Sequence, residues 1–215
     1  MSTGIAMMQR GMHIAFTGTD GAGKSTQAGL LRKWLSDEGY YCYLAESKDE
    51  FATNVVRLVS HSKGGSPRSV FPNGVVDFAI AFDTLRHHTS YIVPVISQGG
   101  IVVVPRSVFC RIALADSFGV ECVDLLEAVL HMTGTPDLTF WLDLPAEQAH
   151  ARIERRGIDS EDMVMLARFR KSLDQLSKRN RWIRLDASQP IEWVQAAVLA
   201  HVRNSIAEGR LELRR

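Results

Sequence analysis

The sequence predicts an α/β fold in which a five-stranded parallel sheet is flanked by helices. Short apolar runs alternate with longer segments of helical period, which is typical of a parallel sheet and its covering helices. The composition, 46% hydrophobic and 23% charged, is that of an ordinary globular protein. A glycine-rich loop also separates the first strand-like run from the first helical segment. Because 215 residues suit one compact core, we expect a single domain over residues 1–215.

The strands of this sheet are expected where β-branched, aromatic and leucine residues cluster between turn-forming or helical segments. Each cluster is short and mostly apolar, as strands are when helices cover both faces of their sheet. The predicted strands span residues 13–17, 41–45, 101–104, 138–142 and 182–185.

The first helix is expected directly after the glycine-rich loop. Ala28, Leu31 and Leu35 recur at helical spacing and form one apolar stripe. Gly39 follows this stripe, where a residue in the left-handed conformation would end the helix. The segment therefore predicts a strand–helix–strand unit.

Breaks in the later helical patterns predict where the chain bends or moves. A long helix is expected over residues 75–97, with Pro94 kinking or ending it. Two helical patterns are interrupted near Asp162, and we expect a short lid over approximately residues 155–163. Residues 61–74 are rich in Gly, Pro and Ser and predict a mobile loop.

Charge and hydropathy exclude several classes of partner. The chain has 25 basic and 24 acidic residues and a formal net charge of +1, so it lacks the excess of cations that general nucleic-acid binding requires. No apolar run approaches the ~18 residues of a membrane-spanning helix. The first residues lack the ordered features of a secretion signal. We therefore expect no nucleic-acid or membrane partner and a cytoplasmic location.

Residues 18–25, GTDGAGKS, satisfy the phosphate-loop pattern G-x-x-x-x-G-K-[ST] between a strand and a helix. In such a loop the backbone N–H groups surround phosphate oxygens, the lysine adds a cation, and the hydroxyl ligates Mg²⁺. The simpler alternative is a glycine turn that only caps a helix. The pattern predicts that a nucleoside triphosphate binds here with Mg²⁺ held by Ser25. The residues assigned to the nucleotide are Gly18, Asp20, Gly21, Ala22, Gly23, Lys24, Ser25 and Thr26.

Four strings in the chain belong together: FTGTDGAGKSTQ at 16–27, TPDLTFWLDLP at 135–145, RIERRG at 152–157 and RWIRLDAS at 181–188. Together they resemble the thymidylate kinase family, within the nucleoside monophosphate kinase group. The resemblance implies a P-loop kinase fold, a loop near residue 188 that approaches the adenine of ATP, and a homodimer formed by helices that flank the sheet. A GTPase is a poor alternative, because the chain lacks the Asn-Lys-x-Asp pattern that reads guanine.

The resemblance also implies roles for charged residues outside the loop. In this family a basic residue from the loop or from the lid neutralises the phosphoryl group in transfer. Here the loop has the uncharged residues Gly21 and Ala22. We therefore expect Arg152, Arg155 or Arg156 of the lid to supply the charge. Arg106 is expected to clamp phosphate, and Asp20 to orient or deprotonate the acceptor.

The acceptor side departs from the family pattern. Ala45 and Thr84 stand where the family has arginines, and Pro105 stands where it has the aspartate before Arg106. The groups that would contact the base are replaced at Leu114 and the following alanine. An uncharged pocket does not offset the desolvation of a monophosphate.

Acidic residues lie in the same segments. Glu46, Asp77 and Asp83, with Arg106, are therefore predicted to bind the acceptor. Their charge favours a small-molecule acceptor that is neutral or cationic, with a hydroxyl of a nucleoside or amino-bearing sugar receiving the γ-phosphoryl group. The alternatives are a genuine thymidylate kinase with a rebuilt acceptor site and a nucleotide-binding protein without catalysis.

Overall fold

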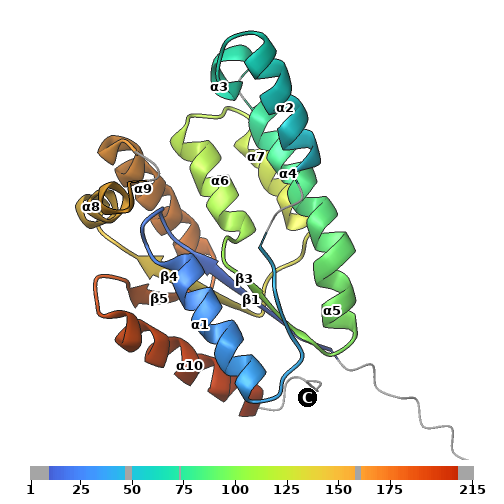
Figure 1. Ribbon diagram of the computed structural model, residues 1–215, viewed down its shortest axis with the longest axis vertical. Coiled ribbons are helices and arrows are strands. Elements are labelled where there is room, and N and C mark those ends of the chain that lie inside the picture. The colour runs from blue at the N-terminus through green and yellow to red at the C-terminus, as the bar shows by residue number, and fades with distance from the viewer. Residues whose placement is uncertain (1–9, 47–49, 73, 158–160, 208–215) are drawn as a thin grey trace, which may run out of the picture.

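The computed structural model describes residues 10–46, 50–72, 74–157 and 161–207. Within these residues five parallel strands form one sheet in the order β2-β3-β1-β4-β5, which confirms the predicted fold class (Figure 1). Each strand lies within one residue of the predicted bounds. The strands are β1 Met12–Thr17, β2 Cys42–Leu44, β3 Ile101–Val104, β4 Leu138–Asp143 and β5 Ile183–Asp186.

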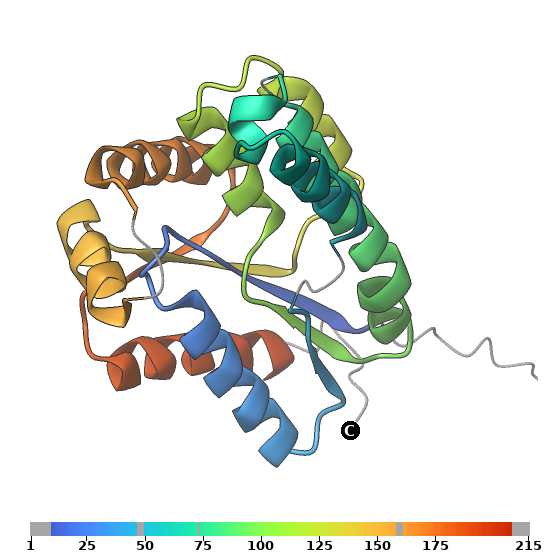
Figure 2. The same cartoon turned by 45° about the horizontal axis from the view of Figure 1, so that its top comes forward.

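Helices cover both faces of the sheet. Helices α1 and α10 lie on one face, and α4, α6, α7 and α9 lie on the other (Figures 1 and 2). None of the helices in the described ranges has both the length and the apolar character of a membrane span. The helical elements are α1 Lys24–Asp37, α2 Phe51–Ser62, α3 Pro67–Val70, α4 Val75–His87, the π-helical turn η1 His88–Ile92, α5 Val93–Ser97, α6 Val108–Ser117, α7 Val123–His131, α8 Ala146–Arg156, α9 Met163–Arg179 and α10 Ile191–Ala207.

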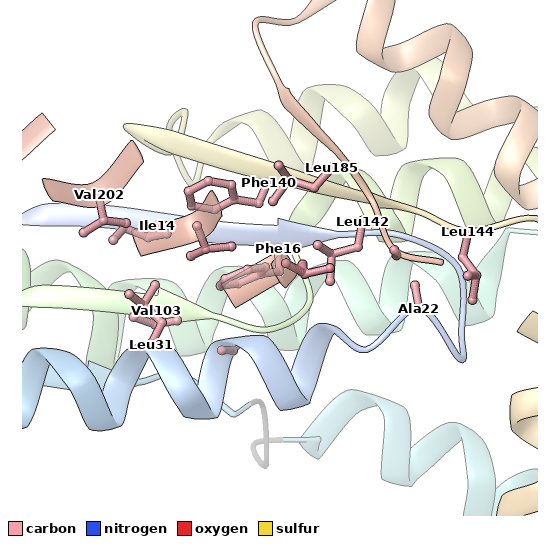
Figure 3. Packing of buried hydrophobic residues seen from close by; sticks show 14 of the residues in the cluster. Ile14, Phe16, Ala22, Leu31, Val103, Phe140, Leu142, Leu144, Leu185 and Val202 are labelled. Carbon is pink, nitrogen blue, oxygen red and sulfur yellow. The ribbon is translucent and has the colours of Figure 1, made fainter. Parts of the chain in front are cut away.

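The central strand β1 is buried along its whole length. It pairs with β3 on one side and β4 on the other, so its backbone N–H and C=O groups are hydrogen-bonded to both neighbours. Ile14 and Phe16 point into the core under α1 and α10 (Figure 3). Trp141 of β4 points to the opposite face, where it packs with Phe109 and Phe169. This rigid strand carries the phosphate loop at its carboxyl end.

Helix α1 forms as its apolar spacing predicts. Ala28, Leu31 and Leu35 are fully buried against the sheet. Gly39 directly follows the helix end and has a φ of 84°, which confirms its predicted left-handed conformation.

The prediction of one long helix over residues 75–97 needs a correction. The segment is continuous in right-handed helical conformation, but the π-helical turn η1 separates α4 from α5. The cause is Pro94, which has no N–H to donate and whose ring collides with the carbonyl oxygen one turn earlier. A wider turn before the proline relieves this collision, so the chain continues where a kink or an end was expected.

The prediction of a loop over residues 61–74 is wrong in part. Helix α2 extends to Ser62, and Pro67 begins the short helix α3. Proline is favoured in the first turn of a helix because its nitrogen needs no partner there. Residue 73 lies outside the described residues, and the mobility of this segment stays a prediction.

Candidate active site

A cavity of about 870 Å³ lies at the phosphate loop and extends beneath α4 and η1. Its walls come from residues 20–27, from the segment after β3, from α8 and from residues 187–191. Strand β1 has β3 on one side and β4 on the other, so the chain order of the sheet reverses here. Ligands of open α/β sheets bind at such a point, beyond the carboxyl ends of the strands. Its volume lies in the range of small-molecule binding sites.

The loop at residues 18–25 has the backbone that phosphate binding needs. Gly18 and Gly21 have positive φ, and a Cβ on either would come within 2.7 Å of a backbone oxygen, that of Leu142 or Ala149. Gly23 also has positive φ, but a Cβ there would meet no atom within 4 Å. The loop is therefore packed on its outer side and open at the start of α1, where the helix N-terminus favours anions.

Lys24 is buried at the base of this loop, with a side chain 6% exposed. Its Nζ donates a hydrogen bond to the backbone oxygen of Thr19 at 2.7 Å and lies 3.5 Å from an Asp20 oxygen. Burial, aided by the charge of Arg106, lowers the pKa of Lys24. The ammonium group is thus fixed beside the loop before any phosphate is bound.

Asp20 and Arg106 form an ion pair across the cavity, between the phosphate loop and the end of β3. Burial opposes ionisation of Asp20, but the charges of Lys24 and Arg106 outweigh it and lower the pKa of this carboxyl. Burial likewise opposes the charge of Arg106, but the carboxylate of Asp20 outweighs burial and raises the pKa of Arg106. Asp20 is consequently an anion with low proton affinity, placed to hold two cations in position.

Glu161, which the sequence analysis missed, comes from the segment before α9 and hydrogen-bonds to Asp20. Burial, together with the hydrogen bond and charge of Asp20, raises the pKa of Glu161 to about 7. Its backbone oxygen is also 2.9 Å from Nδ1 of His150 on α8. This part of the expected lid is therefore anchored to the phosphate loop.

The three arginines at the end of α8 all line the cavity. Arg152 donates to the backbone oxygens of Gly21, at 3.4 Å, and Ala187, at 2.9 Å, and so connects the loop to the segment after β5. Arg155 and Arg156 are exposed at the last turn of the helix. Residues 158–160 of the predicted lid lie outside the described residues.

The structure does not gather the predicted acceptor acids. Glu46 lines the cavity, but Asp77 and Asp83 do not. Asp77 accepts two hydrogen bonds from Arg68, at 2.9 and 2.8 Å. Asp83 accepts from the backbone N–H of Ala52 and from both the N–H and the hydroxyl of Thr53.

These two carboxylates hold α4 to its neighbours α3 and α2. The sequence suggested acidity at the acceptor site because it does not show which acids are already paired. The described lining of the cavity instead contains two carboxylates, Asp20 and Glu46, against six cations. The cations are Lys24, Arg106, Arg111, Arg152, Arg155 and Arg156.

Two further groups of the lining were given no role by the sequence analysis. Arg111 lies one helical turn into α6, and no motif in the sequence singles it out. His13 and His88 also line the cavity, with ring centroids 6.0 Å apart. Burial and the charge of His88 lower the pKa of His13 to about 4, so this ring adds no positive charge at neutral pH.

Ser25 is the residue that fits a magnesium ion carried by ATP. It is exposed to the cavity in the first turn of α1 and offers a hard hydroxyl oxygen. Mg²⁺ commonly takes one or two protein ligands and completes its shell with phosphate oxygens and water. The open side of the loop beside Gly23 leaves room for such a group.

Comparison with known proteins gives one consistent result. The thymidylate kinase family model matches residues 16–198. A thymidylate kinase of Prochlorococcus marinus (strain MIT 9313) is 27% identical over 208 residues, which cover 90% of this chain and 94% of the relative. A thymidylate kinase of an Exiguobacterium species is 29% identical, covering 94% and 99% of the two chains.

A probable thymidylate kinase of Pyrococcus horikoshii is 31% identical over 153 residues, which cover 71% of this chain and 74% of the relative. The residues matched by the family model, 16–198, span the phosphate loop, the segment after β3 and helix α8. The chain therefore belongs to the thymidylate kinase family, a family of ATP-dependent phosphotransferases.

Proposed function

We propose that this protein phosphorylates thymidylate with ATP, giving thymidine diphosphate and ADP. The observation that carries the proposal is the charge of the cavity, where six cations face two carboxylates among the described lining residues. Two phosphate-bearing substrates would offset this charge, whereas a cationic sugar would add to it. Family membership supports the same acceptor, so thymidylate replaces the hydroxyl acceptor expected from the sequence.

In the proposed reaction an oxygen of the thymidylate phosphate attacks the γ-phosphorus of ATP. The bond from that phosphorus to the β–γ bridging oxygen breaks, and ADP leaves with the electron pair. Lys24 and the loop N–H groups hold the donor phosphates, and Arg106 neutralises charge on the group in transfer. Magnesium bound with ATP supplies further positive charge, and the Ser25 hydroxyl would hold it.

Asp20 is assigned a positioning role in this reaction. A phosphate acceptor is already largely ionised at neutral pH and needs no general base. The lowered pKa of Asp20 also makes its carboxylate a weak base. Its contacts with Lys24 and Arg106 fix the two cations on the phosphoryl group instead.

The described sheet and helices support a single P-loop kinase domain over residues 1–215, with a lid near 155–163. Lid closure would bring Arg155 and Arg156 over the phosphates and exclude water. A cytoplasmic location is part of the proposal, because the donor ATP is kept inside cells.

A homodimer is also proposed, through the outer face of α2 and α4. These helices carry Phe51, Leu58 and Phe82 at exposures of 71%, 71% and 58%, and an apolar groove runs between them. A second copy would cover this face.

Sedimentation velocity should give a dimer for the wild type and a monomer for Phe82→Glu. A dimer in both would refute this interface, and Trp193→Glu on α10 is the exposed aromatic control.

The test of the reaction is the identity of the product. Phosphorus NMR of the protein with ATP, Mg²⁺ and thymidylate should give the coupled signals of a new diphosphate. A new phosphate monoester with thymidine, and no diphosphate with thymidylate, would assign the protein to hydroxyl acceptors. ATP binding without any product would leave a nucleotide-binding protein without catalysis.

A further inference from the structure

Arg111 of α6 is a cation of the cavity for which the described residues provide no hydrogen-bond or ion-pair partner. Lys24, Arg106 and Arg152 each donate a hydrogen bond to a backbone or carboxylate oxygen. Arg111 is half-buried and lines the same cavity, yet within the described ranges its guanidinium forms no hydrogen bond or ion pair. A guanidinium has five donors and stays protonated in proteins, so this group is left with its charge and its donors unused.

The surroundings of Arg111 make this arrangement unfavourable in the empty protein. Burial and the nearby charge of Arg106 lower its pKa, and the acids that act on it from a distance have other partners. Asp20 is paired with Arg106, and Glu50 with Arg57. Two guanidinium groups close together in a partly buried site repel unless an anion lies near both. A bound anion would remove that cost.

Arg111 enters the cavity from a different element than the phosphate loop. The phosphate loop leads into α1, whereas Arg111 belongs to α6, and these helices cover opposite faces of the sheet (Figures 1 and 2). Ala45 and Thr84, at the positions where the resemblance led us to expect arginines, also line the cavity and carry no charge. Ser107 and Val108 also line the cavity at the N-terminus of α6, a position that favours anions. Arg111 therefore offers its charge from the side of the cavity that α6 forms, where a second substrate has room to bind.

We propose that Arg111 is a specificity-determining residue that binds the phosphate of the nucleoside monophosphate acceptor. This inference rests on the proposed function and deepens it, because it assigns recognition of the acceptor's charge to one side chain. It also explains how the site would bind the thymidylate phosphate although Ala45 and Thr84 replace the two arginines expected from the family. Arg106 then serves the group in transfer, and Arg111 holds the acceptor beside it.

The test is calorimetric binding of thymidylate and thymidine to the wild type and to Arg111→Gln. Thymidylate should bind about ten- to hundredfold more weakly to the variant, the usual effect of losing one charge-assisted contact. Thymidine has no phosphate and should bind within about twofold of the wild type, and the KM for ATP should change as little. Arg111→Lys keeps the charge and should restore part of the affinity. Arg168→Gln, which removes an exposed cation of α9 outside the cavity, is the matched control.

Equal losses for thymidylate and thymidine, or no loss for either, would overturn the inference. Arg111→Met replaces Arg111→Gln if the latter does not fold. Binding is measured without ATP, so it is independent of turnover. A wild type that binds thymidylate without forming product would refute the proposed function alone. A wild type that does not bind thymidylate would refute both.

Discussion

Lys24 shows how one side chain connects the core to the chemistry. It is buried, and its ammonium group is fixed by the Thr19 backbone oxygen, so its charge is already in position when ATP binds. Lys24→Met keeps most of the apolar volume and removes the charge. We expect kcat to fall by about two to three orders of magnitude, because the reaction depends on electrostatic stabilisation.

Steady-state turnover of thymidylate and a melting curve of each variant would check this expectation. Lys33→Met is the control, because Lys33 is on the same helix but exposed and paired with Asp37 at the surface. Turnover by Lys24→Met at near the wild-type rate would contradict the phosphate-loop assignment.

Glu161 makes stability depend on pH near neutrality. Its pKa is raised from 4.5 to about 7, so the fold favours its protonated form, which donates to Asp20. This contribution is complete below pH 4.5 and is lost as pH rises through 7. Solvent reaches the group, so the loss is about 1 kcal/mol after screening.

Glu161→Gln keeps a donor at every pH and should remove this dependence. Urea unfolding at pH 5 and pH 8 would measure the free energy of unfolding of both proteins. The wild type should lose more stability than the variant between the two values. Parallel losses would show that the carboxyl of Glu161 does not titrate against Asp20.

At the scale of elements, Asp83 fixes the N-terminus of α2 to α4. It accepts three hydrogen bonds from Ala52 and Thr53, and although burial opposes its charge, these bonds lower its pKa. Asp83→Asn has one acceptor oxygen and should reduce the free energy of unfolding by about 1–3 kcal/mol at pH 7. KM for thymidylate, like KM for ATP, should stay near the wild-type value, because Asp83 is outside the cavity.

Urea titrations at pH 7 and pH 3 would test this. Because the pKa of Asp83 is lowered, its contribution exists above the unfolded value of 3.8 and is lost as pH falls through the folded value. The difference between wild type and variant should therefore shrink at pH 3. Asp37→Asn, an exposed surface pair, should cost less than 1 kcal/mol. A large rise in KM for thymidylate, with little loss of stability, would return Asp83 to the acceptor site.

Local sequence patterns predicted the elements better than the connections between them. The strands were found within one residue, because β-branched residues must be buried between covering helices. The π-helical turn before Pro94 was missed, since its form depends on how the flanking helices continue. The phosphate loop was predictable because its residues are contiguous. The acceptor site was not predictable in this way. The sequence does not show that Asp77 pairs with Arg68 or that Asp83 accepts hydrogen bonds from α2, because these partners meet only in the folded chain.

At the scale of the whole molecule, a nearly neutral chain concentrates positive charge at one place. The net charge is +1, yet the described lining of the cavity has six cations and two carboxylates. The fold achieves this by converging α6, α8 and the phosphate loop on the carboxyl ends of the strands. Such a field favours anionic substrates over neutral analogues of the same shape.

The central claim is that the protein selects its acceptor by the phosphate group. The ratio of kcat/KM for thymidylate to kcat/KM for thymidine tests this claim most directly. Both acceptors carry the same base and sugar, so the ratio isolates the effect of the phosphate. With ATP and Mg²⁺ at saturation, the account predicts a ratio of at least about 100, the value expected from one or two charge-assisted contacts. A ratio at or below one, with efficient phosphorylation of thymidine or an aminated sugar, would contradict it.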